Sequence, residues 1–214
     1  YLMEQKKNGR IRHLGFSCHG NLPVLKRFLE AYGKDMEFCQ LQLNYIDWSF
    51  QNGREKVALL DSYHIPVWVM EPLRGGRLAR LSEAESAPLK EMRPEEPVPA
   101  WAFRFLQSIP SVTMILSGMS DLEQMKANIA TFRTDAPLSG SEMDRLLAHA
   151  QDMVRKAGVP CTACHYCVSH CPQGLDIPGL LALYNEHAFT GGGFIAPMAL
   201  SALPKDKWPS ACLG

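Results

Sequence analysis

The segment that decides the fold is Ile65-Pro66-Val67-Trp68-Val69-Met70, which runs into Glu71-Pro72-Leu73-Arg74-Gly75-Gly76. The first six residues are almost all apolar, and a run of this length and composition is typical of a strand buried on both faces of a parallel sheet. The next six contain a proline and paired glycines, which end a strand and begin a loop. The sequence therefore predicts an α/β protein built around a parallel sheet.

The same pattern of a strand followed by a helix occurs before this segment. A strand is predicted at 12–17, and a helix then begins near Asn21 and ends at Gly33. A second strand is predicted at 38–43 and a second helix at 53–64. These ranges form two complete strand–helix units.

The pattern continues after the segment. An acidic, proline-rich loop is expected at 82–99, and a helix that contains Trp101 follows it. A fourth strand is predicted at 112–116, and the helix after it is expected to open with a capping box at Ser120-Asp121-Leu122-Glu123. We assign four residues of that helix to a buried apolar face: Leu122, Met125, Ile129 and Phe132.

Four successive strand–helix units predict parallel strands joined by right-handed connections. A doubly wound sheet would carry a Gly-x-Gly-x-x-Gly turn after its first strand, and this chain has none there. Four units in residues 1–135 amount to half of an eight-unit (β/α)8 TIM barrel of about 250 residues. Such a half leaves two unpaired sheet edges, so we expect the other half to exist elsewhere and the chain to be a fragment.

Beyond residue 135 the composition changes, and we expect a second domain at 136–214. A connector helix is predicted at 141–157 and another helix at 177–187, so this domain should be mostly α-helical. Between the two helices lies a cysteine-rich segment. We expect it to form a tight loop that carries metal ligands.

Four cysteines have the C-x2-C-x2-C-x3-C-P spacing of bacterial iron–sulfur segments. They are Cys161, Cys164, Cys167 and Cys171, and Pro172 follows them. In such segments three thiolates hold one [4Fe–4S] cluster and the fourth reaches a second cluster. Cys212 is expected to open the second run, so each cluster would lack ligands in this chain and would be held poorly.

Other interpretations of the cysteine segment are a zinc site, a disulfide pair or unrelated thiols. Zinc sites usually present two well-separated pairs of ligands, whereas these four cysteines lie within one short run. The spacing favours iron–sulfur clusters. A zinc-stabilised interaction domain remains the alternative.

The overall composition excludes several classes of protein. Lys plus Arg and Asp plus Glu both number 22, and no basic patch is present, so the sequence does not indicate a nucleic-acid-binding protein. No apolar stretch is long enough to span a bilayer, and residues 1–7 lack the apolar segment of a signal peptide. Cysteines clustered as metal ligands suit a reducing compartment. We therefore expect a soluble, cytoplasmic protein.

Four motifs in order resemble the second half of the aldo-keto reductases. Lys7-Asn8-Gly9-Arg10-Ile11-Arg12-His13-Leu14-Gly15-Phe16-Ser17 resembles the fifth strand of that family. The segment that begins Gln40-Leu41-Gln42 resembles the sixth strand, and Glu71 to Gly76 the loop after the seventh. Ser117 to Gln124, together with Asn128, resembles the eighth helix. With its cysteine segment, the chain is most similar to an aldo-keto reductase fused to a ferredoxin-type domain with two [4Fe–4S] clusters.

The resemblance implies a nicotinamide cofactor, NADP(H), across the mouth of the barrel. It implies that Ser17 and Gln40 hold the carboxamide and that the loop with Pro72, Leu73 and Gly75 lines the pyrophosphate. It further implies that two residues meet the adenosine phosphate and two hold the adenine: Gly118 and Ser120, then Gln124 and Asn128. A helix N-terminus near Ser120 suits a phosphate on physical grounds as well, because its N–H groups are free donors.

No catalytic residue is assigned. In the family that the chain resembles, the catalytic Asp, Tyr, Lys and His lie in the first half of the barrel, which this chain lacks. His19, Tyr45 and Asp47 follow predicted strands on the rim where barrel enzymes keep their chemistry, but loop surface is the favoured interpretation for them. Cys18 and Cys39 are expected to be packing thiols.

These inferences lead to two main hypotheses. The first is an NADP(H)-dependent oxidoreductase that reduces a carbonyl or oxidises an alcohol, coupled to [4Fe–4S] electron transfer with a ferredoxin or flavin as a possible redox partner. Because its catalytic half is missing, the fragment alone should be inactive. The alternative is a non-catalytic iron–sulfur module for electron transfer or binding, or the zinc-stabilised domain described above.

Overall fold

The computed structural model of the chain describes residues 1–159, 161 and 165–213. The chain forms two compact units, Tyr1–Ala150 and Gln151–Gly214, and the division between them falls within one long helix. The domain boundary expected at residue 135 stays a prediction. Each unit is described on its own.

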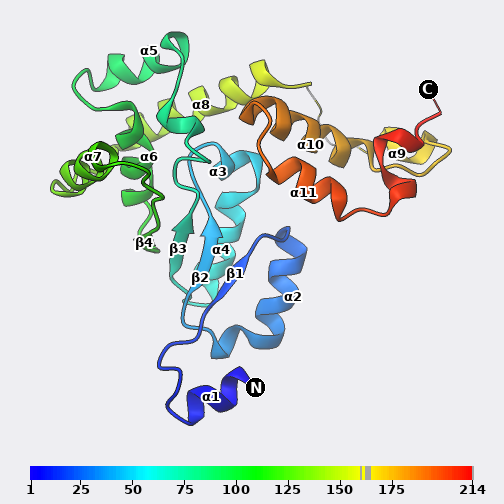
Figure 1. Ribbon diagram of the computed structural model, residues 1–214, viewed down its shortest axis with the longest axis horizontal. Coiled ribbons are helices and arrows are strands. Elements are labelled where there is room, and N and C mark those ends of the chain that lie inside the picture. The colour runs from blue at the N-terminus through cyan, green and yellow to red at the C-terminus, as the bar shows by residue number, and fades with distance from the viewer. Residues whose placement is uncertain (160, 162–164, 214) are drawn as a thin grey trace. The chain divides into compact units, whose positions relative to one another are not determined.

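The first unit is built around a four-stranded parallel sheet in the order β1-β2-β3-β4 (Figure 1). The strands are β1 (Phe16–Cys18), β2 (Cys39–Gln42), β3 (Val67–Met70) and β4 (Val112–Ile115). All three pairings are parallel, so the carboxyl ends of the strands lie along the same edge. The strand order follows the chain without a reversal, as in a barrel, whereas a doubly wound sheet reverses its order. The predicted α/β fold with a parallel sheet is confirmed.

Helices connect the strands and cover one face of the sheet. The described helices of the first unit are α1 (Leu2–Lys7), α2 (Leu22–Tyr32), η1 (Gly33–Asp35), α3 (Asp47–Phe50), α4 (Gly53–Ser62), η2 (Arg77–Ala79), α5 (Glu83–Met92), α6 (Val98–Gln107), α7 (Leu122–Phe132) and the start of α8 (Gly140–Ala157). Asn21 starts α2 as expected, because its side chain accepts the Val24 N–H at 3.1 Å.

The core lies between these helices and the sheet. Leu25 and Leu29 of α2 are buried, and α6 contributes Trp101, Phe103 and Phe105. The Phe105 ring lies edge-on to two aromatic rings that follow β2, at 6.4 and 5.5 Å between centroids. Full burial of side chains of this size stabilises a fold by roughly 1.5–3 kcal/mol each, so α6 is a main source of the unit's stability.

The sheet is fully buried on one face only. In β2 and in β3 buried and half-buried residues alternate, with Val67 and Val69 buried and Trp68 and Met70 half-buried. The expectation that 65–70 is buried on both faces is therefore wrong. The half-buried face of this sheet is the one that a complete barrel would turn toward its interior, where opposite strands would cover it.

The acidic, proline-rich stretch at 82–99 is mostly helical, which corrects the expected loop. Ser82 caps α5: it accepts the Glu85 N–H at 3.3 Å, and the Glu85 carboxylate accepts the Ser82 N–H at 2.9 Å. This reciprocal pair is a capping box. The Ser-x-x-Glu spacing was present in the sequence, and it outweighs the proline within the helix, Pro88.

Two expectations for α7 are also corrected. Its cap is Asp121 rather than Ser120, because the Asp121 carboxylate accepts the Gln124 N–H at 2.8 Å. The four residues assigned to its buried face are all exposed: Leu122, Met125, Ile129 and Phe132. The physical reason is that α7 follows β4, and β4 pairs with β3 alone among the described strands.

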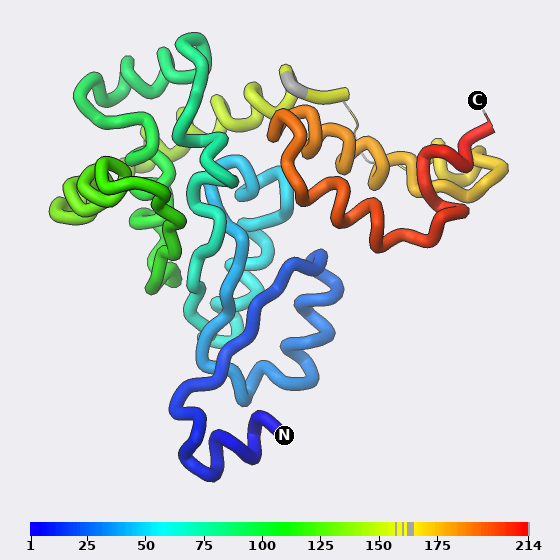
Figure 2. The backbone as a smooth tube through the Cα atoms, in the orientation of Figure 1, coloured from blue at the N-terminus to red at the C-terminus, as the bar shows by residue number. Residues whose placement is uncertain are grey.

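The second unit is helical in its described residues. After the end of α8 it contains α9 (Tyr166–His170), α10 (Ile177–Thr190), α11 (Ile195–Ser201), η3 (Lys205–Lys207) and η4 (Pro209–Ala211). Helices α10 and α11 pack side by side (Figure 2). The Asn185 side chain on α10 bonds the N–H and the carbonyl of Val159, at 2.6 and 2.8 Å, and so fixes the chain after α8. Among the described helices of either unit, none has the length and apolar composition needed to cross a membrane.

Candidate functional site

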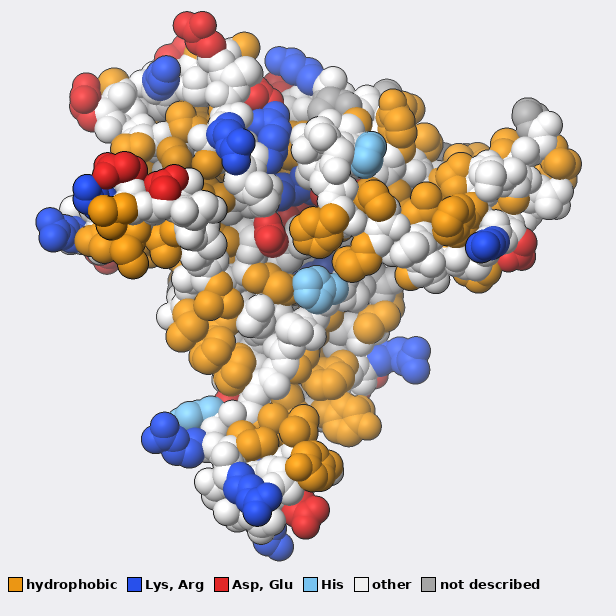
Figure 3. All heavy atoms as spheres, viewed as in Figure 1, with side chains coloured by type: hydrophobic (Ala, Val, Ile, Leu, Met, Phe, Trp, Pro, Cys, Tyr) orange, Lys and Arg blue, Asp and Glu red, His pale blue; other side chains and the backbone are white. Residues whose placement is uncertain are grey.

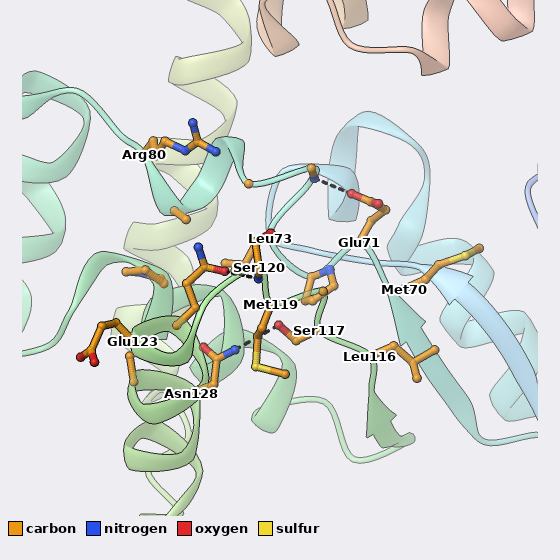
Figure 4. Close-up of a pocket in the computed structure, with 18 of the residues that line it drawn as sticks. Met70, Glu71, Leu73, Arg80, Leu116, Ser117, Met119, Ser120, Glu123 and Asn128 are labelled. Carbon is orange, nitrogen blue, oxygen red and sulfur yellow. Dashed lines mark hydrogen bonds between the residues drawn. The ribbon is translucent and has the colours of Figure 1, made fainter.

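A cavity of about 830 Å³ lies at the carboxyl ends of β2, β3 and β4 (Figure 4). This edge of a parallel sheet is where barrel enzymes and open α/β proteins bind their ligands. Two segments form most of its lining. We call residues 71–76, which follow β3, the loop wall, and residues 117–124, which follow β4 and begin α7, the helix wall.

The loop wall is a tight turn with an unusual backbone. Glu71, Arg74, Gly75 and Gly76 all have positive φ, between 50° and 84°. Glycine adopts this conformation without cost, whereas Glu71 and Arg74 need contacts that hold them there. The Arg74 N–H bonds the Glu71 carbonyl at 3.0 Å, and the Gly75 N–H donates to the Glu71 carboxylate (Figure 4).

A buried ion pair fixes the loop wall from beneath. Arg74 Nε lies 3.1 Å from Asp47 Oδ1, and the two side chains are 1% and 0% exposed. Asn44 Nδ2 donates to Asp47 Oδ2 at 2.7 Å and to the Glu71 carbonyl at 3.0 Å, and Gln42 Nε2 also donates to Asp47 Oδ2, at 2.9 Å. The carboxylate is thus satisfied on both oxygens, as a buried charge requires. Asp47 therefore positions the loop from the interior and is not a surface rim residue.

The helix wall is polar and more exposed. Asn128 Nδ2 donates to Ser117 Oγ at 3.1 Å, and Gln124 Oε1 accepts the Ser120 N–H at 2.8 Å (Figure 4). A Cβ added to Gly118 would meet no atom within 4 Å, so this glycine faces open space at the cavity. The start of α7 directs its positive dipole end to the same region.

The structure brings together eight of the nine residues predicted to bind the cofactor. They line the same cavity and are Gln40, Pro72, Leu73, Gly75, Gly118, Ser120, Gln124 and Asn128. Ser17 does not line it, although it pairs with Gln40 across β1 and β2. Of the two strand glutamines, Gln40 lies at the cavity and Gln42 binds Asp47. Cofactor binding by these residues stays a prediction.

The sequence analysis missed several residues of the site. Arg80 is an exposed cation at the rim of the cavity, and its Nη2 lies 3.6 Å from the position of a Cβ on Gly76 (Figure 4). The sequence contained a signal for Arg80, because a basic residue shortly after a Gly-Gly turn is a candidate phosphate ligand. The pairing of Asp47 with Arg74 had no such signal, because the two residues are 27 positions apart.

The other two residues expected at the rim, His19 and Tyr45, lie in different surroundings. His19 is exposed, whereas Tyr45 is buried, and burial raises the pKa of Tyr45 well above its usual value. Neither residue lines the cavity. Cys18 and Cys39 are buried as expected of packing thiols, and burial raises the pKa of Cys39 to about 12.

The predicted metal ligands lie in the second unit. Cys164 is outside the described residues, and Cys161, Cys167, Cys171 and Cys212 are exposed or half-buried thiols. Where the chain is described, no three or more His, Cys, Asp or Glu side chains gather in a way that could hold a metal ion. Residues 166–170 form the short helix α9, which differs from the expected loop. Metal binding by these cysteines stays a prediction.

Cys171 has the most distinctive surroundings of the described cysteines. Its Sγ accepts the Leu175 N–H at 3.4 Å. This hydrogen bond, together with those from Gln173 and Gly174, lowers the pKa of Cys171 against the opposing effect of burial. Lys207, which donates to the Gln173 carbonyl at 2.8 Å, adds a nearby positive charge. These contacts favour a thiolate, the form in which cysteine binds metals.

Comparison with known proteins agrees with this architecture. The sequence profile of the Aldo/keto reductase family matches residues 1–151. An aldo-keto reductase from Bacillus halodurans, AKR11C1 in its holo form, superposes with a TM-score of 0.55 at 23% identity, over 69% of this chain and 53% of that chain. The thermostable aldo-keto reductase Tm1743, solved with the inhibitor epalrestat, gives 0.56 at 19% identity over 69% and 52%.

A third structure is an aldo-keto reductase from Klebsiella pneumoniae in complex with NADPH, with a TM-score of 0.53 and 19% identity over 67% of this chain and 50% of that one. No curated protein sequence matches the chain significantly. The chain spans about half the length of these solved structures, and at these identities they establish the fold alone. The profile match covers well over half of the sequence, so this chain belongs to the Aldo/keto reductase family.

Proposed function

We propose that the first unit binds NADP(H) in the cavity between the loop wall and the helix wall. The observation that carries this proposal is that eight of the residues that the family resemblance implies for the cofactor line one cavity. In its intact form the protein would be an oxidoreductase that interconverts a small-molecule carbonyl and an alcohol, in a reducing compartment such as the cytoplasm. The NADPH complex of the Klebsiella pneumoniae relative supports the choice of cofactor.

The residues present fit this cofactor. A cavity of about 830 Å³ suits a ligand of this class. Gly75 and Gly76 leave the backbone open to close approach by a pyrophosphate, and the N-terminus of α7 favours a phosphate. The Gln40 amide, whose Nε2 lies 3.5 Å from Met70 Sδ, is available to bind and orient a carboxamide. When bound, the nicotinamide supplies hydride transfer, and the residues of this chain hold and orient it.

A substitution at Gly118 tests this proposal, because Gly118 lines the cavity and an added Cβ there would meet no atom within 4 Å. We expect NADPH to quench the tryptophan fluorescence of the protein saturably, and Gly118→Leu to weaken binding at least about tenfold. Gly140→Leu is the matched control, since Gly140 also has no atom within 4 Å of an added Cβ but lies at the start of α8, away from the cavity lining. Equal binding by Gly118→Leu, or no binding by the unsubstituted chain, would contradict the proposal.

A second candidate function concerns the region from residue 136 to 214. We infer that it is a ferredoxin-type domain, whose cysteines Cys161, Cys164, Cys167, Cys171 and Cys212 bind [4Fe–4S] clusters for electron exchange with a ferredoxin or flavin partner. The cysteine spacing and the N–H donors at Cys171 support it. When present, such clusters supply one-electron transfer, and this chain supplies thiolates and N–H donors to them.

Metal analysis after anaerobic reconstitution tests the second candidate. We expect iron and sulfide to be incorporated in equal amounts but at low occupancy, because each cluster lacks ligands in this chain, and Cys171→Ser should lower both. Cys18→Ala is the control, because Cys18 is buried in the first unit. Zinc without iron or sulfide would establish the zinc-stabilised domain, and the absence of any bound metal would contradict both interpretations.

A further inference from the structure

The side chain of Glu71 binds a backbone donor within the cavity. Glu71 directly follows β3 and lines the cavity, and its carboxylate accepts the Gly75 N–H (Figure 4). The two residues are close by a second measure, because a Cβ built on Gly75 would lie 3.9 Å from Glu71 Oε2. Under the proposed function, Gly75 lies beside the pyrophosphate of the cofactor. The carboxylate therefore takes the N–H donor that an oxygen of a bound phosphate would use.

The main chain of Glu71 is held by contacts that do not involve its carboxylate. Its φ is 57°, and its carbonyl accepts Asn44 Nδ2 at 3.0 Å and the Arg74 N–H at 3.0 Å. These two hydrogen bonds fix the turn through the carbonyl oxygen. The carboxylate can therefore leave the Gly75 N–H by rotation of the Glu71 side chain, while the loop wall keeps its shape.

The charges that line the cavity do not favour an anion. Among the described lining residues, the charged ones are Glu71, Arg80 and Glu123, so the carboxylates outnumber the cations. Figure 3 shows both acidic and basic side chains near the carboxyl ends of β2 and β3. Like charges at short range repel each other, most strongly where water is partly excluded. A phosphate that approaches the Gly75 N–H therefore meets the negative charge of Glu71.

We propose that the Glu71 carboxylate is an internal competitor that the cofactor pyrophosphate must displace from the loop wall. This inference rests on the proposed binding of NADP(H) in the cavity. When the cofactor binds, the Glu71 side chain turns away and a pyrophosphate oxygen accepts the Gly75 N–H in its place. Glu71 thus holds the affinity for the cofactor below the value that the same turn would give without the carboxylate.

A carboxylate in a nucleotide cavity can also act as a ligand, because it accepts hydrogen bonds from ribose hydroxyl groups. The two roles predict opposite signs. Removal of a competitor tightens binding of the cofactor, whereas removal of a ligand weakens it. The structure favours competition, because the Glu71 carboxylate already bonds the Gly75 N–H, a donor that suits a phosphate and not a hydroxyl hydrogen. The sign of the change in affinity therefore decides between the roles.

Titration of the chain with NADPH, followed by tryptophan fluorescence, tests the proposal. We expect Glu71→Ala to tighten NADPH binding about tenfold, because both the charge and the competing acceptor are removed. Glu71→Gln should give a smaller gain, since its amide oxygen is neutral but still accepts an N–H. Each variant keeps a non-glycine residue at this positive φ, so the backbone cost is similar. The control is Glu95→Ala, which removes an exposed carboxylate from a turn outside the cavity lining and should leave the affinity unchanged.

A second titration with NADH identifies the phosphate that Glu71 opposes. Both nicotinamide dinucleotides contain the pyrophosphate, and only NADPH carries the additional phosphate on the adenosine ribose. Glu71→Ala should therefore tighten binding of the two cofactors by the same factor. Unchanged or weaker binding of NADPH by Glu71→Ala, or a gain for NADPH alone, would overturn the inference while the proposed function stands. If neither the unsubstituted chain nor Glu71→Ala binds NADPH, both the proposed function and this inference are wrong.

Discussion

The two walls of the cavity are held in place by different physical means. The loop wall has positive φ at four positions and lies over a buried ion pair between Arg74 and Asp47, at 3.1 Å. The helix wall depends on exposed or partly buried hydrogen bonds, from the Ser120 N–H to Gln124 and from Asn128 to Ser117. Buried charged contacts cost far more to break than surface hydrogen bonds. The loop wall is therefore preorganised, and the helix wall is the side that can adjust to a ligand.

Removal of the buried carboxylate should have the largest effect. Asp47→Ala removes the buried carboxylate that lies 3.1 Å from Arg74 Nε, and breaking this buried pair is expected to lower the free energy of unfolding by about 3–5 kcal/mol. Urea unfolding measures this loss. The double variant Asp47→Leu with Arg74→Met should recover part of it, because no buried charge is then left unpaired.

A surface ion pair is the control for this prediction. Asp152 accepts from Arg155 at 2.7 Å on the exposed face of α8, with side chains 50% and 71% exposed. Asp152→Ala should change the free energy of unfolding by no more than about 0.5 kcal/mol. A loss for Asp47→Ala as small as that for Asp152→Ala would mean that the loop wall is not held by the buried pair.

A substitution of Arg80 should have the next largest effect, which concerns the choice between NADPH and NADH and not the stability of the fold. Its guanidinium lies at the rim of the cavity beside Gly76, where we propose that it binds the adenosine phosphate that distinguishes NADPH from NADH. We expect Arg80→Gln to weaken NADPH binding about tenfold and to leave NADH binding almost unchanged, because charge-assisted bonds to phosphate are worth about 1.5–3 kcal/mol. Lys126→Gln on α7 is the control, since Lys126 does not line the cavity. Equal losses for both cofactors would remove Arg80 from phosphate recognition.

The sequence could predict the parts of the cavity that depend on local signals. Gly75 and Gly76 mark a turn after an apolar strand, and Asn21 marks the start of α2, because each acts within a few residues of its own position. The order of the strand–helix units then predicts which strand ends meet at one edge of the sheet.

The remaining features depend on contacts between distant parts of the chain. Asp47 and Arg74 come together because β2 and β3 are neighbours and each residue lies in the segment that follows its strand. The exposure of Met125 and Ile129 depends on what lies beside β4, which an amphipathic pattern does not reveal. The cysteine spacing predicts a ligand set, but it does not determine whether the described thiols gather in the folded chain.

The cap of α7 tests the helix wall with a smaller effect. Asp121→Ala removes the acceptor for the Gln124 N–H and should destabilise the start of α7 by about 1 kcal/mol. Faster amide exchange at 124–125 and a few-fold weaker NADPH affinity are the expected results. Asp176→Ala removes the equivalent cap of α10 in the second unit and serves as the control. If both variants lower NADPH affinity equally, the helix wall has no specific role.

The smallest expected effect is a pH dependence of the free energy of unfolding, which comes from an ion pair beside the loop wall. Arg77 of η2 forms an ion pair with Glu85 of α5. Burial raises the pKa of Glu85, but hydrogen bonds from Arg77 and Ser82 outweigh it and hold the pKa below its usual value of 4.5. A carboxyl group whose pKa is lower in the folded state than in the unfolded state stabilises the fold. This contribution is complete when the pH lies above the unfolded-state pKa, and it is lost as the pH falls to the folded-state pKa.

Unfolding of the native chain and of Glu85→Gln over a range of pH isolates this contribution. At neutral pH the variant should be less stable by a few tenths to about 1 kcal/mol, because the pair is partly exposed. The difference should shrink as the pH falls below 4.5 and vanish below the lowered folded-state pKa, where the native carboxylate becomes neutral. A difference that stays constant with pH would mean that Glu85 acts through packing or capping alone. The ion pair would then add nothing to the loop wall beyond what Asp47 and Arg74 provide.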